Sequence, residues 1–276
     1  MQHIMINGVP RSGTSLLGQI FNSCPDVAYR YQPLFSYPLK GFLNTESSQK
    51  DIDDFFLKAY QSRDEMILQT HQRARQVHST FSKNLNPDYL AVKHVRYHHL
   101  LENILKKNTS VKIIGIIRHP CGVINSWHKT RREFDIKWNI KDEWRTASKK
   151  NKDRKEEYFG FMKWKEAAEL FIKLRQDFPQ HFKLIQYEDL VENKYVIVSE
   201  IFKFTGMEMT KSTIDFLDAS NTKEVDDPDS VFRTNDVIYR WKKELDPEIQ
   251  HEIISEISRT PLEQFLDREL KSNKRL

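Results

Sequence analysis

The stretch that decides the fold is Gly8-Val9-Pro10-Arg11-Ser12-Gly13-Thr14-Ser15, near the start of a chain of 276 residues. It follows a short apolar run at 3–6 and precedes residues 16–21, where apolar residues recur one helical turn apart. This order predicts a strand, a glycine-containing loop and a helix. Backbone N–H groups of such a loop converge at the positive end of a helix dipole, so we expect it to bind a phosphate.

The two glycines of the loop have the spacing of the nucleotide-binding pattern G-x-x-x-x-G-K-[ST], but Thr14 occupies the lysine position. That lysine normally reaches the β- and γ-phosphates, so its absence disfavours an ATP or GTP hydrolase. Arg11 supplies a cation within the loop, and its guanidinium can hold an oxyanion through two hydrogen bonds. A P-loop kinase that uses Mg-ATP stays open as an alternative, against which Thr14 argues.

A second anion site is predicted after residues 111–117, whose near-continuous β-branched character indicates a central parallel strand buried on both faces. Arg118 leaves the carboxyl end of this strand, where open α/β sheets bind ligands. A helix is expected to begin at Pro120, and Ser126 falls near its second turn. We expect Arg118 and Ser126 to meet on one phosphate.

The rest of the chain alternates strand and helix patterns. Further strands are expected at 27–31, 90–95 and 182–187, and helices at 51–69, 156–177 and 194–205, the last ended by Gly206. Two later helices have legible starts at Asp246-Pro247 and at Thr260, which has capping-box spacing to Glu263. The alternation predicts a single α/β domain over 1–276, a three-layer P-loop-type fold with a central, mainly parallel sheet flanked by helices.

Taken together, these motifs resemble the PAPS-dependent sulfotransferase superfamily. Residues 10–16 resemble its 5′-phosphosulfate loop, in the arginine-containing form of carbohydrate and tyrosylprotein sulfotransferases, and Arg118 with Ser126 resembles its 3′-phosphate motif. Tyr187-Glu188-Asp189-Leu190 is similar to a segment whose tyrosine lies near the adenosine. Phe204-Thr205-Gly206 and Tyr239-Arg240-Trp241 are less specific counterparts. The resemblance covers roughly residues 1–35, 88–128 and 182–245.

The resemblance implies 3′-phosphoadenosine 5′-phosphosulfate (PAPS) as co-substrate, 3′-phosphoadenosine 5′-phosphate (PAP) as product, and no catalytic metal. The residues expected to bind the donor are Arg11, Ser12, Gly13, Thr14, Ser15, Arg118, Ser126 and Tyr187. Arg11 is expected to neutralise charge on the bridging oxygen as PAP leaves. The missing loop lysine also fits, because PAPS has no γ-phosphate.

Three further residues are candidates for the chemistry. Lys93, at the end of a predicted strand, is expected either to contact the sulfuryl oxygens or to extend to solvent. Gln32 stands where arginine-loop relatives often carry a glutamate; it is a poor proton acceptor but can orient a hydroxyl. His94 is the first candidate for the general base, because an ordinary histidine pKa of about 6.5 suits neutral pH. The alternatives for this base are His98, His99, His119, His128 and Glu133.

Residues 129–155 contain eleven basic and five acidic residues, with Trp138 and Trp144 between them. One interpretation is a solvated helical cap, as charge runs usually are. The other is an acceptor lid, a basic helical insertion in which cations attract an acidic saccharide and tryptophans stack on sugar rings. We favour a carbohydrate hydroxyl as acceptor, with a protein tyrosine, a lipid or a small alcohol as alternatives.

The formal net charge of the whole chain is +5. This mild excess suits an anionic ligand but falls short of the dense basic patches of nucleic-acid-binding proteins, so a non-catalytic polyanion-binding protein is the less favoured alternative. The two cysteines, Cys24 and Cys121, form no disulfide framework. The sequence has no apolar run of about 20 residues and no signal-peptide pattern at its start. These features predict a cytoplasmic protein without a transmembrane segment.

Overall fold

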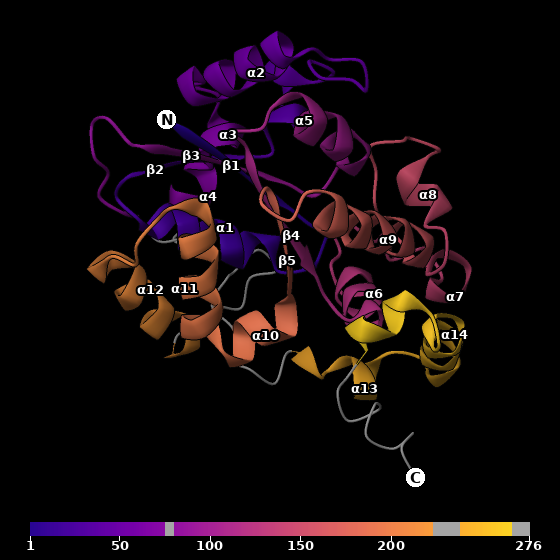
Figure 1. The fold of residues 1–276 in the computed structure, drawn as a ribbon. Helices are drawn as coiled ribbons and strands as arrows, with labels where there is room; N and C mark the ends of the chain where they lie inside the picture. Colours follow the sequence, from indigo (N-terminus) through magenta and orange to yellow (C-terminus); the bar gives the residue numbers. More distant parts are fainter. Residues whose placement is uncertain (75–79, 223–237, 267–276) are drawn as a thin grey trace.

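The computed structural model describes residues 1–74, 80–222 and 238–266, which contain a five-stranded sheet shown in Figure 1. Its strand order is β2-β3-β1-β4-β5, and every neighbouring pair is parallel. The strands are β1 (Gln2–Asn7), β2 (Val27–Tyr31), β3 (Tyr89–His94), β4 (Lys112–Ile117) and β5 (Phe182–Gln186). Because all strands run the same way, their carboxyl ends share one edge of the sheet, where a ligand site is expected.

The longer helices include most of those expected from sequence. They are α1 (Thr14–Ser23), α2 (Gln49–Gln61), α5 (Leu101–Lys107), α6 (Pro120–His128), α9 (Phe161–Asp177), α10 (Tyr187–Glu192), α11 (Lys194–Thr205), α12 (Lys211–Thr222) and α14 (Pro247–Ile257). Single turns are α3 (Glu65–Leu68), α4 (Thr70–Ala74), α7 (Ile140–Glu143), α8 (Ser148–Asn151) and α13 (Trp241–Glu244). Short 3₁₀ segments are η1 (Pro33–Phe35), η2 (Tyr37–Leu39), η3 (His98–Leu100) and η5 (Pro261–Phe265).

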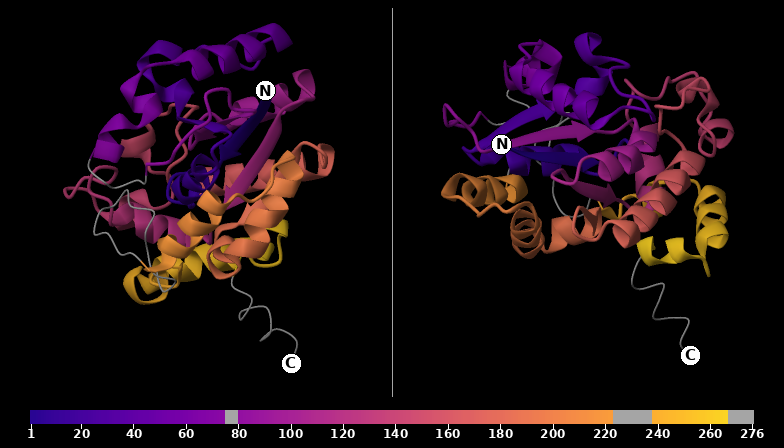
Figure 2. Two further views of the ribbon diagram at one scale, coloured as in Figure 1. Left: turned by 90° about the vertical axis from the view of Figure 1, so that its left-hand side faces the viewer. Right: turned by 45° about the horizontal axis from the view of Figure 1, so that its top comes forward.

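A hydrophobic core lies on each face of the sheet, and the helices that pack on these two cores form the outer layers of a three-layer fold. Alternate residues of β1 point to opposite faces, so Ile4 and Ile6 join one core and Met5 joins the other. The first core contains residues of α1, α11 and α12, and the second contains residues of α2, α5, α6, α9 and α14. Figure 2 shows α2 and α5 across the sheet from α11 and α12. The three-layer α/β fold predicted from sequence is confirmed.

Two predicted helices differ from the observed ones at their ends. The pattern at 51–69 is split into α2 and α3, and Asp64 starts the second piece by accepting a hydrogen bond from the N–H of Ile67. The helix expected over 156–177 begins only at Phe161. Gly160 has a φ of 83° and a ψ of 167°, a backbone conformation that is not helical. Periodicity continues across both breaks because the flanking side chains still face the same core.

The ends of the last elements follow their caps. Asp246 accepts from the N–H of Glu248 and starts α14 as predicted. Thr260 caps a 3₁₀ turn, η5, by accepting from the N–H of Leu262, whereas the Glu263 carboxylate accepts from the N–H of Arg259. Both cysteines are buried, and neither is part of a disulfide bond. Within the described ranges, no helix has the length and apolar character needed to cross a bilayer.

Candidate active site

The loop between β1 and α1 is built on two glycines with different constraints. A Cβ on Gly8 would lie 2.6 Å from the carbonyl oxygen of Ile116, so glycine is needed for β4 to pack this closely against the loop. Gly13 has a φ of 87°, and a Cβ there would lie 2.1 Å from Cδ2 of Tyr187. Positive φ and the tight contact both require glycine, which fixes the direction in which α1 starts.

The first turn of α1 presents N–H groups that have no acceptor within the helix. The N–H of Ser12 already donates to the carbonyl of Val9 at 3.2 Å, which closes the loop, and its side chain is fully buried. Thr14, at the lysine position of the nucleotide-binding pattern, is also buried. The N–H groups of Gly13, Thr14 and Ser15 are therefore the backbone donors available at the mouth of the loop.

Arg11, Arg118 and Ser126 lie together beside this loop. Nε of Arg11 donates to Oγ of Ser126 at 3.1 Å, and Nη1 of Arg118 donates to the carbonyl oxygen of Arg11 at 3.2 Å. Arg11 has a φ of 72°, an uncommon backbone conformation for arginine that directs its side chain toward α6. Glu133 Oε2 lies 3.9 Å from Nε of Arg11. The tertiary fold therefore gathers two guanidinium groups where an anion can neutralise them.

The side chain of Arg118 packs against the Tyr187 ring and against Gly122. Its guanidinium lies 4.9 Å from the centroid of the Tyr187 ring, and its Nε is 2.9 Å from the place of a Cβ on Gly122. Burial lowers the pKa of Arg118, while Tyr187 and Glu188 act in the opposite direction. The group still stays charged at neutral pH, because a guanidinium is not deprotonated in proteins. A buried, permanently charged side chain at a strand end is suited to binding a phosphate.

Glu188 and Trp241 both contact His119, the residue that precedes α6. Glu188 Oε1 accepts from the N–H of His119 at 3.0 Å, and His119 stacks on Trp241 with ring centroids 4.2 Å apart. Asn125 of α6 donates to Glu244 of α13 at 2.7 Å. The segment around Trp241 thus covers the helix that carries Ser126. Residues 223–237, within the resemblance to known sulfotransferases, lie outside the described residues.

Lys93 and His94 are adjacent in sequence but point to opposite faces of the sheet. Lys93 shares a face with Ala91, and its Nζ lies 3.4 Å from Oγ of Ser15 and 4.5 Å from the centroid of the Tyr31 ring. His94 points to the face that packs on α2, with its ring 6.2 Å from that of Phe55. The fold therefore brings Lys93 to the phosphate loop and turns His94 away from it.

His94 is also chemically unlike a base poised for neutral pH. It is 1% exposed, and burial lowers its pKa to about 3, with a smaller contribution from Lys93. Burial likewise lowers the pKa of His98 and of His119 to about 3. Burial and orientation together favour a base other than His94. Glu133, beside Arg11, is a partly exposed carboxylate.

Gln32 lies at the carboxyl end of β2 in a cluster that residue patterns along the chain do not predict. Its Oε1 accepts from Nη1 of Arg96 at 3.1 Å, and Nε of Arg96 donates to Glu157 at 2.8 Å. Its backbone N–H donates to the carbonyl of Lys93 at 2.8 Å, which joins the cluster to the end of β3. Arg96 could have been suspected from its place just after a strand. Glu157 carries no sequence signal, because only tertiary folding brings it here.

The basic segment 129–155 is only partly helical, with the single turns α7 and α8. Trp144 is 5% exposed and packs against Phe161 in the core, so it is not available to stack on a sugar. Trp138 is half-buried against Phe134. The tryptophan part of the acceptor-lid hypothesis therefore reduces to Trp138.

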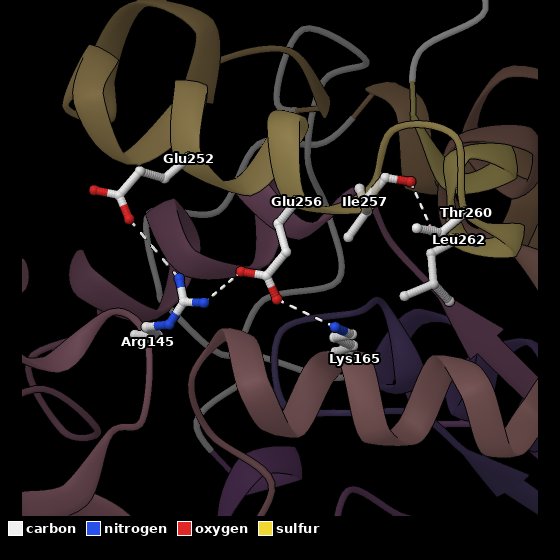
Figure 3. A network of polar contacts seen from close by, with 7 residues as sticks. All are labelled: Arg145, Lys165, Glu252, Glu256, Ile257, Thr260 and Leu262. Carbon is white, nitrogen blue, oxygen red and sulfur yellow. Dashed lines mark hydrogen bonds and ion pairs between the residues drawn. The ribbon is translucent and has the colours of Figure 1, made fainter.

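Two cations of this segment, Lys141 and Arg145, form ion pairs with α14 and with its N-cap residue Asp246. Figure 3 shows Arg145 with Glu252 and Glu256, and Lys165 of α9 on the other oxygen of Glu256 at 3.2 Å. Lys141 lies 3.2 Å from Asp246 and 3.0 Å from Glu248. Lys150 differs from these: it is half-buried, its Nζ lies 5.0 Å from the centroid of the Phe159 ring, and burial lowers its pKa. The guanidinium of Arg96 lies 5.8 Å from the centroid of the same Phe159 ring, which places Lys150 near the cluster around Gln32.

Residues 3–211 match a protein-family model described as "Sulfotransferase family". The carbohydrate sulfotransferase 1 of Danio rerio is 23% identical in an alignment of length 274 that covers 78% of this chain. The chain spans 64% of the length of that curated relative.

Solved structures of similar fold include two that contain PAP. Mouse sulfotransferase SULT7A1 complexed with PAP has a TM-score of 0.59 at 16% identity, covering 95% of this chain and 87% of its own. A retinol dehydratase complexed with retinol and PAP has a TM-score of 0.56 at 15% identity, covering 94% and 82%. The sulfotransferase domain from the curacin biosynthetic pathway has a TM-score of 0.53 at 16% identity, covering 94% and 98%.

Proposed function

Because this chain belongs to the sulfotransferase family, we propose that it transfers a sulfuryl group from PAPS to an acceptor hydroxyl and releases PAP. The observation that carries this proposal is the pair of guanidinium groups, Arg11 and Arg118, gathered with Ser126 beside the start of α1. PAPS has a phosphosulfate at its 5′ end and a phosphate at its 3′ position, so it needs two neighbouring anion sites. ATP has no phosphate at the 3′ position.

In this proposal, the N–H groups of Gly13, Thr14 and Ser15 hold the 5′-phosphate, helped by the dipole of α1. Arg118 and Ser126 bind the 3′-phosphate, and the Tyr187 ring, which covers Gly13, packs on the nucleoside. Lys93, with Nζ near Ser15, lies one strand from the loop and contacts the sulfuryl oxygens. These residues bind and orient the donor without a metal.

The reaction forms a bond between the acceptor oxygen and sulfur and breaks the bond from sulfur to the bridging oxygen. The bridging oxygen keeps the electron pair and leaves as part of PAP, and the hydroxyl proton passes to a base. Charge stabilisation supplies much of the rate in such loose transfers. Arg11 neutralises the leaving oxygen once its guanidinium exchanges Ser126 for the donor. Glu133 is the proposed base, since its carboxylate lies beside Arg11.

A carbohydrate acceptor is the favoured finer assignment. Its supports are the distant likeness to a carbohydrate sulfotransferase and the half-buried Lys150, which suits an acidic sugar. Labelled transfer from [³⁵S]PAPS to a hyaluronan tetrasaccharide and to chitotetraose tests it, because only the first carries carboxylates. Lys150→Gln should reduce transfer to hyaluronan more than transfer to chitotetraose. Transfer to a tyrosine peptide or a simple alcohol alone would contradict a carbohydrate acceptor. The cytoplasmic location stays a prediction.

The donor assignment is tested by calorimetric titration with PAP, adenosine 5′-monophosphate and Mg-ATP. We expect PAP to bind in EDTA, and Arg118→Ala to reduce its affinity about 10- to 100-fold, as for a lost charged hydrogen bond of about 1.5–3 kcal/mol. Adenosine 5′-monophosphate lacks the 3′-phosphate, so its weaker binding should change little in this variant. Preference for Mg-ATP would instead support a P-loop kinase.

A further inference from the structure

Gln32 belongs to a chain of three side chains whose hydrogen-bond directions are fixed by chemistry. Arg96 has only N–H donors, so the group of Gln32 that faces it at 3.1 Å must be the amide oxygen. The NH₂ group of Gln32 therefore lies on the other branch of the amide, directed away from Arg96. This orientation makes the free end of Gln32 a hydrogen-bond donor.

Arg96 is itself held from three sides. Its Nε donates to Glu157 at 2.8 Å, and its guanidinium lies 4.0 Å from the centroid of the Phe35 ring and 5.8 Å from that of Phe159. The side chains of Arg96 and Glu157 are only 11% and 7% exposed. A charge pair this well covered keeps one geometry, because breaking a buried pair leaves an uncompensated charge.

The position of Gln32 assigns it to the acceptor side of the site. Its backbone N–H is bonded to Lys93 at the carboxyl edge of the sheet, and β3 separates β2 from the strand that carries the phosphate loop. With strands about 4.8 Å apart, Gln32 lies about 10 Å along the edge from that loop. Gln32 also has a φ of 45°, a conformation that costs about 1 kcal/mol and that directs the chain into η1.

We propose that Gln32 donates a hydrogen bond to an oxygen of the carbohydrate acceptor, and that Glu157 is a positioning residue that fixes this donor through Arg96. This inference rests on the proposed function and deepens it by naming acceptor-side residues. It also accounts for an amide at position 32: the charge that balances Arg96 comes from Glu157, so position 32 is free to supply a donor.

Four variants separate this proposal from a general structural role. Glu157→Ala removes the anchor, and Glu157→Gln keeps an oxygen for Arg96. Gln32→Glu removes the donor, and the double variant Q32E/E157Q exchanges acid and amide around Arg96 with the charge unchanged. Glu102→Gln is the matched control, since Glu102 of α5 pairs with Lys106 and Lys173 instead of with Arg96.

Kinetics with [³⁵S]PAPS and the hyaluronan tetrasaccharide give the first readout. We expect Glu157→Ala and Gln32→Glu to raise the acceptor KM about tenfold, the size of one lost hydrogen bond, with PAP affinity unchanged. Glu157→Gln should be milder, and the double variant should stay as poor as Gln32→Glu. A Gln32→Glu or double variant as active as wild type would overturn the proposal.

A second readout needs no turnover. In protein labelled with ¹⁵N-glutamine and saturated with PAP, the Gln32 side-chain amide pair is identified by its absence from Gln32→Glu. Glu157→Ala should shift this pair, whereas Glu102→Gln should not. A pair that is insensitive to Glu157→Ala would overturn the positioning role even if no carbohydrate is sulfated. Failure of PAP to bind wild type would instead contradict the proposed function.

Discussion

Gly13 shows how one backbone conformation couples the two halves of the proposed donor site. Its φ of 87° starts α1, and its missing side chain makes room for the Tyr187 ring. Gly206 is the natural comparison: it ends α11 with a φ of 76°, but a Cβ there would meet nothing within 4 Å.

Gly13→Ala should therefore cost more than the left-handed conformation alone. We expect a loss of about 1–3 kcal/mol in the free energy of unfolding and at least a tenfold loss in PAP affinity, because Tyr187 and the loop must shift. Urea unfolding and calorimetric titration measure the two effects. Gly206→Ala is the control, expected to cost about 1 kcal/mol without weakening PAP. Equal effects of the two substitutions on PAP would contradict the coupling.

The general base is decided by which side chains can reach the acceptor. Glu133→Gln should lower kcat about 100-fold, within the range for loss of general-base catalysis, and leave PAP affinity almost unchanged. His94→Gln should leave kcat within about threefold, because this side chain faces the α2 side of the sheet. Steady-state kinetics with [³⁵S]PAPS compares them. A large fall in kcat for His94→Gln alone would restore His94 as the base.

The residues predicted to bind the donor could be identified in the sequence because each lies near a strong local pattern. Arg11, Arg118 and Ser126 each stand at a fixed offset from a strong strand or glycine signal, so their place in the fold follows from local pattern. His94 illustrates the limit of this reasoning. A strand end locates a residue at the correct edge, but the alternation of side chains decides which face it serves.

Segment 129–155 is attached to the rest of the protein in two ways: the buried side chain of Trp144 packs in the core, and Arg145 on its surface forms ion pairs. Trp144 packs in the core that α9 and α14 share, whereas Trp138 is only half-buried on Phe134. Arg145 joins this segment to α14 through Glu252 and Glu256 (Figure 3). Exposed pairs of this kind contribute about 0–1 kcal/mol each, so packing is the stronger anchor.

Trp144→Ala should therefore mainly affect stability, whereas Trp138→Ala should mainly affect the KM for the acceptor. We expect Trp144→Ala to lower the free energy of unfolding by about 3–5 kcal/mol, as for a truncated buried aromatic residue. Trp138→Ala should cost about 1 kcal/mol and raise the KM for the hyaluronan tetrasaccharide while PAP affinity is kept. Urea unfolding and acceptor kinetics separate the two. An unchanged KM in Trp138→Ala would leave the segment a structural cap.

The end of a helix is predictable from sequence where a residue of the helix or next to it ends the helix. It is not predictable where packing against a distant segment ends the helix. Lys194–Thr205 was predicted with its bounds because Gly206 ends the helix with its own left-handed backbone. The long helix expected at 156–177 loses its first turn because Gly160 adopts an extended positive-φ conformation next to Ala147. That contact is with a residue of another element, which periodicity alone does not contain.

At the scale of the whole molecule, three buried histidines link stability to pH. Burial lowers the pKa of His94, His98 and His119 to about 3, whereas unfolded histidine titrates near 6.5. Between these values the unfolded chain binds more protons than the folded one, so stability is lost as pH falls from about 6.5 toward 3. Each histidine contributes about 1.4 kcal/mol per pH unit in this window, and three give about 4.

Urea unfolding midpoints should therefore be nearly constant above pH 7 and fall steeply between pH 6.5 and 5.5, before most carboxylates begin to titrate. His94→Gln should reduce the pH slope of the free energy of unfolding by about 1.4 kcal/mol per pH unit, because one linked group is removed. The same slope in wild type and His94→Gln would contradict a depressed pKa for His94. A stability that rises on acidification would contradict the linkage for all three.

Four features are predictable from the amino-acid sequence: the α/β class, the glycine loop at 8–15, the strand that precedes Arg118 and the sulfotransferase resemblance. These depend on local patterns: hydrophobic runs, glycines and short offsets along the chain. Only the tertiary structure joined Gln32, Arg96 and Glu157, separated Lys93 from His94, and buried Trp144. Their partners lie far away in sequence, and which side chains meet is decided by strand order, side-chain alternation and core packing.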